Sequence, residues 1–192
     1  CSIIGVSNNA PSLFPLGTTE VIWTITDSSG NTATASQIVT ISDSEKPQIS
    51  SPSDVFDHTA PQKCTASQVE LGSPITSDNC GISSVTNNAP EFFPIGETTV
   101  TWTATDQSGN IATATQLVTI TDQEDPVISA PEDITVLTSS SRCTATVDLG
   151  SPITSDNCEV SSISSNAPAE FPVGETTVTW TITDASGNTA VD

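Results

Sequence analysis

The sequence predicts an all-β chain of tandem, disulfide-linked β-sandwich modules, and three observations support this prediction. The chain repeats itself, since the segment LGSPITSDNC at 71–80 recurs letter for letter at 149–158. Apolar residues alternate with Thr in the repeated segments, which is the two-residue period of a half-buried strand. The chain also holds 31 Thr and 28 Ser but no Met and only three Lys and Arg, so β propensity exceeds helix propensity.

The tryptophans define the length of the repeat. Trp23, Trp102 and Trp180 are 79 and 78 residues apart. A repeat of this size forms an independent small domain, because solenoid repeats run to about 20 to 45 residues. We therefore expect residues 1–42 to be the second half of one module, 43–121 to be complete, and 122–192 to lack the last strand. Because both ends fall inside modules, the sequence predicts that the chain is a segment of a longer repetitive chain, or that a neighbouring chain supplies the missing strand.

Local patterns predict the strands of the complete module in order. Residues 47–50 and 54–56 form a short edge strand broken by proline, and 64–70 and 82–86 are two further strands. At 97–105, Val100, Trp102 and Ala104 share one face, and the loop DQSGN at 106–110 turns the chain into 111–121. We expect Ala112, Ala114, Leu117, Val118 and Ile120 to form the apolar side of that last strand. Short strands separated by turns are typical of an immunoglobulin-like sandwich, and we expect all three tryptophans to be buried in the cores.

The cysteines occur as one pair in each module. Repetition of the pair indicates intramodule disulfides, Cys64 with Cys80 and Cys143 with Cys158, which leaves Cys1 without a partner in the sequence. Closing a loop of about 15 residues stabilises a small domain by about 3 kcal/mol in the chain-entropy model. Buried free thiols are the alternative, whereas two Cys per module and a single His cannot supply a zinc site. Disulfides predict an oxidising compartment, and therefore a secreted, extracellular or cell-surface protein.

Four motifs of the complete module together resemble the hyalin repeat (HYR) family. They are Asp-x-Glu-x-Pro, Ser-Asp-Asn-Cys-Gly, Phe-Pro-x-Gly-x-Thr-Thr-Val and Thr-Asp-x-Ser-Gly-Asn, at 43–47, 77–81, 93–100 and 105–110. The last two recur at 171–178 and 183–188, and again at 14–21 and 26–31 with Glu20 in place of the second Thr, so the resemblance extends over essentially the whole chain. It implies an extracellular, immunoglobulin-like module found in tandem arrays of adhesion, matrix and cell-surface proteins. Family members often carry a second cysteine pair, which this chain lacks.

Acidic residues recur at the start of each module. In a sandwich, the loop at 106–110 and the loop before Cys80 return to the end where the chain enters, so these acids should converge there. Oxygen ligands of this kind are what Ca²⁺ prefers, and carboxylates with almost no Lys or Arg nearby repel one another unless a cation neutralises them. The alternative is that Asp and Asn only form turns. The candidate ligands are Asp43, Glu45, Asp78, Asp106 and Asn110 at one junction, and Asp122, Glu124, Asp156, Asp184 and Asn188 at the next.

Composition excludes several functions. A formal net charge of −20 with three Lys and Arg argues against nucleic acid as a partner and against an anionic membrane surface. No apolar run reaches the roughly 20 residues of a membrane helix, so we expect no membrane insertion. His58 is single and unrepeated, the many Ser lack a partner His, and no cleft-forming insertion accompanies the Asp pairs. We therefore expect that the chain is not an enzyme.

The first functional hypothesis is a structural segment of an extracellular repetitive stalk, adhesin or filament, whose partners are further modules or copies of itself. The second is a module that binds a glycan or a surface protein through its loops or its Thr-rich faces. Glycan sites usually display exposed aromatics, and the three Trp and five Phe mostly sit at positions that resemble core, which favours the first hypothesis. An accessory module of an enzyme encoded elsewhere in the parent chain is the third.

Overall fold

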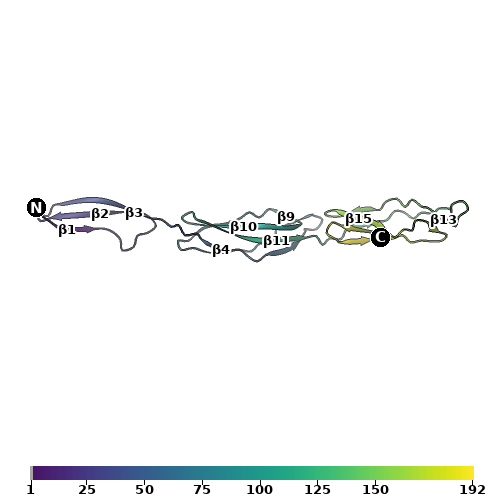
Figure 1. Ribbon diagram of the computed structural model, residues 1–192, viewed down its shortest axis with the longest axis horizontal. Helices are drawn as coiled ribbons and strands as arrows, with labels where there is room; N and C mark the ends of the chain where they lie inside the picture. Colours follow the sequence, from purple (N-terminus) through teal and green to yellow (C-terminus); the bar gives the residue numbers. More distant parts are fainter. Residues whose placement is uncertain (1) are drawn as a thin grey trace. The chain divides into compact units, whose positions relative to one another are not determined.

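The computed structural model describes residues 2–192, so Cys1 lies outside the described residues. All regular structure in this part of the chain is β-strand (Figure 1). Among residues 2–192, no helix is long and apolar enough to cross a lipid bilayer. The strands of the complete module are β4 (Gln48–Ser50), β5 (Val55–His58), β6 (Thr65–Ser67), β7 (Ile75–Ser77), β8 (Ile82–Asn87), β9 (Phe92–Pro94), β10 (Gly96–Asp106) and β11 (Ile111–Thr121).

These strands form the layers of a sandwich. The larger sheet has the order β5-β11-β10-β8, in which β5 runs parallel to β11. The antiparallel pairs β4-β7 and β6-β9 make up the other strand pairings of the module. The segment predicted as one proline-broken edge strand therefore divides at Pro52, with β4 before the break and β5 after it in different sheets. The predicted all-β fold of tandem immunoglobulin-like sandwich modules is confirmed.

Strict alternation along β10 and β11 creates the core of the complete module. Val100 and Ala104 are fully buried and Trp102 is 6% exposed, as the pattern predicts. On β11 the buried residues are Gln116, Val118 and Ile120, so Gln116 and not Leu117 continues the inward face. The amide nitrogen of Gln116 donates to the carbonyl oxygens of Ser53 and Leu71 at 2.7 and 2.9 Å, which satisfies this buried polar group.

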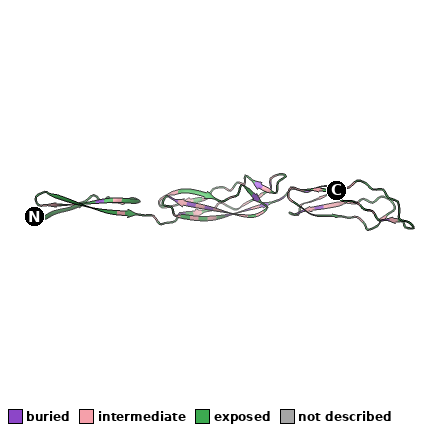
Figure 2. Cartoon of the chain, turned by 90° about the horizontal axis from the view of Figure 1, so that it is seen from above, coloured by how far each residue is buried: buried purple, intermediate pink, exposed green. Residues whose placement is uncertain are grey.

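The first strands of the chain form a more exposed sheet. Strands β1 (Ile3–Asn8), β2 (Gly17–Asp27) and β3 (Thr32–Ile41) pair in sequence order. Val21 is buried, but Trp23 is 39% exposed, so the prediction that all three tryptophans are buried is wrong for Trp23. Among the described residues no further strand joins this sheet, and most of its residues are exposed (Figure 2).

Residues 122–192 repeat the strand pattern of the complete module. The pairs β12-β14 and β13-β16 and the sheet β15-β17-β18 correspond to β4-β7, β6-β9 and β8-β10-β11. Ile182 and Ala145 are buried, but Trp180 is only half-buried, so the prediction of a buried tryptophan holds for Trp102 and not for Trp180. The bounds are β12 (Val127–Ser129), β13 (Thr144–Ala145), β14 (Ile153–Ser155), β15 (Val160–Ser165), β16 (Phe171–Pro172), β17 (Trp180–Asp184) and β18 (Thr189–Val191).

The chain divides into two compact units. The first unit contains residues 1–50, 74–86 and 102–114, and the second contains 51–73, 87–101 and 115–192. Each unit contains one start of a module: Asp43 with its surroundings in the first, and Asp122 with its surroundings in the second. The candidate sites below therefore each lie within a single unit.

Two acidic clusters and a disulfide

The hairpin loop at 106–110 is built around the Asp106 carboxylate. Its Oδ1 accepts the backbone N–H groups of Ser108 and Asn110, both at 2.8 Å, and its Oδ2 accepts the Asn110 side-chain amide at 2.7 Å. Gly109 has a φ of +92°, which only glycine adopts without strain. Asp106 is 1% exposed, and burial alone would raise its pKa, but these hydrogen bonds hold the pKa below its ordinary value. The carboxylate therefore stays ionised inside the protein.

Three carboxylates gather in the first unit. One oxygen from each of Asp43, Asp78 and Asp106 lies within 4.8 Å of the others. Asp43 Oδ1 accepts the Glu45 N–H at 3.1 Å, and Asp78 Oδ2 accepts the Cys80 N–H at 2.7 Å. The remaining oxygens, Asp43 Oδ2 and Asp78 Oδ1, are buried and receive no hydrogen bond within the described residues. Two acceptor atoms are thus left facing a cluster that holds only negative charge.

The second unit repeats this arrangement around Asp122. Oxygens of Asp122 and Asp156 and the Cys158 sulfur lie within 4.8 Å of one another. Asp122 is 6% exposed, yet its Oδ2, like Asp156 Oδ1 and Asn157 Oδ1, receives no hydrogen bond within the described residues. Burial would raise the pKa of Asp122, but hydrogen bonds from Asn157, the Glu124 N–H and other neighbours keep the pKa below its ordinary value. A buried carboxylate is therefore held charged with one oxygen unpartnered.

The structure gathers only some of the predicted ligands. Asp43, Asp78 and Asp106 meet in one cluster, and Asp122 and Asp156 in the other. Glu45 is exposed, and Glu124 Oε2 instead accepts the Gln62 N–H at 2.8 Å.

The predicted ligands in the hairpin loops act as turn residues. Asp184 is buried, but its oxygens accept three hydrogen bonds from Ser186 and Asn188, as turn chemistry requires. The amides of Asn110 and Asn188 donate to the carbonyl oxygens of Asp43 and Asp122, at 3.4 and 3.3 Å, and so act as donors there.

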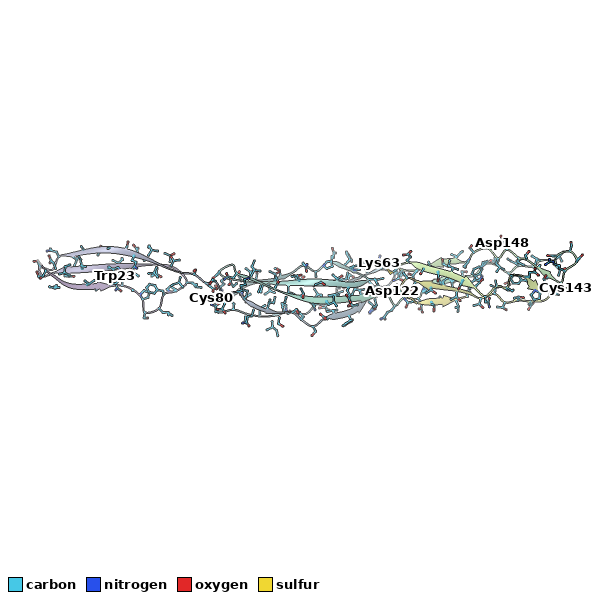
Figure 3. All side chains as sticks on the ribbon, viewed as in Figure 1. Trp23, Lys63, Cys80, Asp122, Cys143 and Asp148 are labelled. Carbon is cyan, nitrogen blue, oxygen red and sulfur yellow. A yellow bond between two sulfur atoms is a disulfide. The ribbon has the colours of Figure 1, made fainter. Side chains whose placement is uncertain are left out.

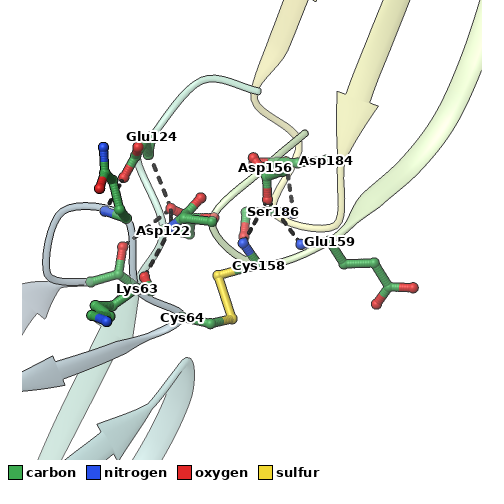
Figure 4. Close-up of a disulfide and its surroundings, with 12 residues drawn as sticks. Lys63, Cys64, Asp122, Glu124, Asp156, Cys158, Glu159, Asp184 and Ser186 are labelled. Atoms are coloured by element: carbon green, nitrogen blue, oxygen red, sulfur yellow. Dashed lines mark hydrogen bonds between the residues drawn. A yellow bond between two sulfur atoms is a disulfide. The ribbon is translucent and has the colours of Figure 1, made fainter. Parts of the chain in front are cut away.

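The disulfide pairing differs from the prediction. Cys64 is bonded to Cys158, with a Cα–Cα distance of 4.7 Å and a sequence separation of 94 residues (Figure 4). Cys80 and Cys143 carry no disulfide. The predicted pairs Cys64–Cys80 and Cys143–Cys158 are therefore wrong. The reason is that an extended chain rises about 3.3 Å per residue, so the segment from Cys143 to Cys158 runs the length of its module. In Figure 3, Cys143 lies at one end of that module and Asp122 at the other. The Cys158 sulfur lies beside Asp122, so Cys143 is too far away to bond to it.

The disulfide is accompanied by hydrogen bonds between the loop 59–64 and the Asp122 cluster. Thr59 Oγ1 donates to Asp122 Oδ1 at 3.2 Å, and the Asn157 amide donates to the Lys63 carbonyl oxygen and to Asp122 Oδ1, both at 3.0 Å. With the Gln62–Glu124 contact, these bonds join the complete module to the next one (Figure 4). Sequence reasoning missed Thr59 and Asn157, although Asn157 lies within the repeated motif Ser-Asp-Asn-Cys.

The free thiol of Cys80 lies beside the first cluster. Burial, followed by the charge and hydrogen bonding of Asp43 and the charges of Asp78 and Asp106, raises the pKa of Cys80 above its ordinary value. A thiolate here would add a further negative charge to three carboxylates. The thiol therefore stays protonated at neutral pH.

Both clusters fit a hard divalent cation. Carboxylate oxygens without a donor are the ligands that Ca²⁺ prefers, and Asp122 Oδ2 belongs to a residue that is more than nine-tenths buried. Within residues 2–192 the ion pairs are His58–Asp57 and Arg142–Glu170, so no Lys or Arg neutralises either cluster. Asp43 and Asp78 would hold the cation in the first unit with Asp106 beside them, and Asp122, Asp156 and Asn157 would hold it in the second.

Comparison with known proteins agrees with this repeat organisation. Hyalin from Lytechinus variegatus is 33% identical over 197 residues, covering 98% of this chain and 37% of that protein. Hyalin from Strongylocentrotus purpuratus is 33% identical over 217 residues, covering 98% of the chain and 17% of that protein. Sushi, von Willebrand factor type A, EGF and pentraxin domain-containing protein 1 from Rattus norvegicus is 38% identical over 171 residues, covering 83% and 5%. The chain thus spans little more than a third of these relatives at most.

Among solved structures, protocadherin gamma B7 extracellular cadherin domains 1–4 match the whole chain and 65% of that structure, with 14% identity and a TM-score of 0.38. A TM-score this low carries no fold assignment, so the assignment rests on the strand pairing and on the match to the family model. The HYR domain model matches residues 42–120 and 121–192, one on each side of the disulfide-bonded junction. This chain belongs to the HYR domain family.

Proposed function

We propose that the chain is a structural segment of an extracellular repetitive protein involved in adhesion, in which consecutive modules transmit tension. The observation that carries this proposal is the Cys64–Cys158 disulfide, which joins two successive HYR segments covalently in addition to the backbone between them. Such a bond is stable in an oxidising compartment, which supports an extracellular or cell-surface location. The two tandem HYR segments and the similarity to the two hyalins support a structural protein built from repeats. No enzymatic step is part of the proposal.

Stretching the full chain by its two ends tests the mechanical role. The disulfide removes the 94-residue separation between Cys64 and Cys158 from the extensible length. At 3.3–3.6 Å per extended residue, the oxidised chain should extend about 310–340 Å less than the Cys158→Ser variant. Addition of a reductant should restore the missing length in the wild type and leave the variant unchanged. Equal extension of the two chains before reduction would contradict the proposal.

Calcium at the two acidic clusters is the second part of the proposal. The unpartnered oxygens of Asp43, Asp78, Asp122 and Asp156 support it, because a bound cation would satisfy these acceptors and relieve their repulsion. The Asp122 cluster contacts the loop 59–64, so a cation there would stiffen the connection between two modules. A cation that binds only the folded chain stabilises it by mass action.

Calorimetric titration of Ca²⁺ into the chelator-treated chain should give saturable heat, and the melting temperature should rise more than in NaCl of equal ionic strength. Asp122→Asn and Asp156→Asn should weaken binding at one cluster. Asp133→Asn, which removes the same charge from an exposed site outside both clusters, is the matched control and should leave binding unchanged. Absence of saturable heat, or an equal loss with the control variant, would contradict the calcium proposal.

A binding role is the second candidate, and one observation favours it. Phe56 and Phe92 are 79% and 55% exposed. These two aromatics therefore lie on the surface, although the sequence indicated that they were core residues. Phe56, Asp57, His58 and Thr119 line a shallow hollow on β5 and β11, which offers an aromatic face beside polar groups. A glycan screen of the wild type against Phe56→Ala tests this candidate. Binding that disappears in the variant would support it, and no binding to any glycan would exclude it for this class of ligand.

A further inference from the structure

The two module starts have the same local geometry. In both, the Glu backbone N–H donates to the first Asp at 3.1 Å, and the Cys N–H donates to the second Asp at 2.7 and 2.8 Å. The same two carboxylate oxygens are left buried without a donor in each. We call these sites receiving ends; they are formed by Asp43, Glu45, Asp78, Asn79 and Cys80, and by Asp122, Glu124, Asp156, Asn157 and Cys158.

Two loops of the second unit also share one conformation. Residues 59–64 and 138–143, here called docking loops, close with the same backbone hydrogen bonds: Ala60 N–H to Thr65 at 2.9 Å, and Ser139 N–H to Thr144 at 3.0 Å. Gln62 and Ser141 have φ values of +59° and +62°, an uncommon conformation for residues other than glycine. Each loop ends in a cysteine. The loop 138–143 is therefore formed in advance, in the shape that 59–64 has when it is docked.

One docking loop and one receiving end are already joined in the structure. The loop 59–64 binds the receiving end at Asp122 through Thr59, Gln62, Lys63 and Cys64. Two of these contacts use only the backbone of the loop, the Gln62 N–H and the Lys63 carbonyl, so they do not depend on side chains. The remaining two use a Thr hydroxyl and a Cys sulfur, and Thr138 and Cys143 occupy the same places in the second loop.

We propose that the receiving end at Cys80 and the docking loop ending in Cys143 are the two unjoined halves of this same connection. Cys80 takes the docking-loop cysteine of a module placed before it, and Cys143 takes the receiving-end cysteine of a module placed after it. The partner on each side is a further module of this kind. In this connection Asp43 accepts the loop hydroxyl and Glu45 accepts the loop N–H, as Asp122 and Glu124 do in the joined one. The Asn79 amide donates to the loop carbonyl, as the Asn157 amide does.

Closing each connection is an oxidation. The two thiols lose two protons and two electrons as the S–S bond forms, and a low-molecular-weight disulfide such as oxidised glutathione accepts the electrons and becomes two thiols. Docking brings the two sulfur atoms together before this exchange. The connection does not require calcium, so its failure would leave the calcium proposal and the Cys64–Cys158 bond unaffected.

The test inserts a second copy of residues 43–121 between residues 121 and 122 of the full chain. Exposed Ser67→Thr and Ser84→Thr changes in the second copy distinguish its peptides by mass. After oxidation in a glutathione buffer, non-reducing peptide mapping should show Cys64 of the first copy joined to Cys80 of the second. It should also show Cys64 of the second copy joined to Cys158. A bond between Cys64 and Cys80 of one copy, or a free Cys80 in the second copy, would overturn the proposal.

A matched variant isolates the loop cysteine. Cys64→Ser in the first copy only should free the thiol of Cys80 in the second copy and leave the bond to Cys158 intact. Alkylation of the unreduced protein measures this directly. If Cys80 of the second copy remains protected, its partner is another cysteine, and the proposed pairing is wrong.

Cys143 is tested independently by extending the chain after residue 192 with residues 115–121 followed by 43–121. The added module provides a receiving end at the same spacing from Cys143 that Cys158 has from Cys64. Mapping should then show Cys143 joined to the added Cys80. A free Cys143 beside an intact Cys64–Cys158 bond would overturn the proposal for the docking loop 138–143.

Discussion

Replacing Cys64 with Ser should destabilise the chain by more than an intramodule disulfide would predict. The bond between Cys64 and Cys158 closes a loop with a sequence separation of 94 residues. In the chain-entropy model, a cross-link of this span stabilises the folded state by about 4.6 kcal/mol at 25 °C, against about 3 kcal/mol for a 15-residue loop. Cys158→Ser should have the same effect, because it removes the same bond.

Urea unfolding of the full chain, followed by tryptophan fluorescence under non-reducing conditions, measures this difference. Cys143→Ser is the control, since Cys143 is exposed and carries no disulfide. Its free energy of unfolding should stay within about 0.5 kcal/mol of the wild type, as for most surface substitutions. A reductant should lower the stability of the wild type but not of Cys64→Ser. The reasoning is refuted if Cys143→Ser costs about 3 kcal/mol, because that is the result expected of a Cys143–Cys158 bond.

Three further results are expected. Trp102→Ala should cost about 3–5 kcal/mol and Trp23→Ala clearly less, because Trp102 is 6% and Trp23 39% exposed; equal losses in urea unfolding would contradict the assigned cores. Gln116→Ala should cost about 1–3 kcal/mol, because it removes the two hydrogen bonds that the buried Gln116 amide makes to the carbonyl oxygens of Ser53 and Leu71, whereas the exposed Gln107→Ala should be nearly neutral. The hairpin loops should loosen in acid, because the pKa values of Asp27 and Asp106 are lowered below 3.8 in the folded chain. Their stabilisation is complete above about pH 5 and is lost progressively as the pH falls through the folded pKa values. The result would contradict this if the protection of the loop amides, measured relative to the intrinsic exchange rate at each pH, were unchanged down to about pH 2.

Strands with a strong local signal were predictable from the sequence. The bounds expected for 111–121 match β11, and 97–105 falls one residue short of β10 at each end, because alternation of Thr with apolar residues identifies the buried face. The three-residue strands β7 and β9 were not predicted, since a segment this short shows no periodicity. Gln116 was missed for a related reason: the inward position is polar, and its partners come from distant loops.

The acidic clusters were predictable only in part. The return of loops to the module entrance brought Asp78 and Asp106 to Asp43, as expected. The second junction depends on contacts between modules, and the sequence of a single module contains no signal for them. Cys64 and Cys80 are close in sequence, but Cys64 precedes a strand that pairs with β9, and Cys80 follows a strand that pairs with β4. Repetition of one cysteine pair in each module therefore indicated the wrong partner.

The span of the disulfide affects how the chain responds to a protease. A single cut anywhere between residues 65 and 157 leaves both fragments joined through Cys64 and Cys158, so they should separate only after reduction. The span of 94 residues also exceeds the 78 to 79 residues of one repeat. If every junction carries the same bond, successive covalent rings overlap, and each peptide bond between the outermost bridges lies inside at least one ring. An array of such modules would then keep its continuity after a cut in any one of them.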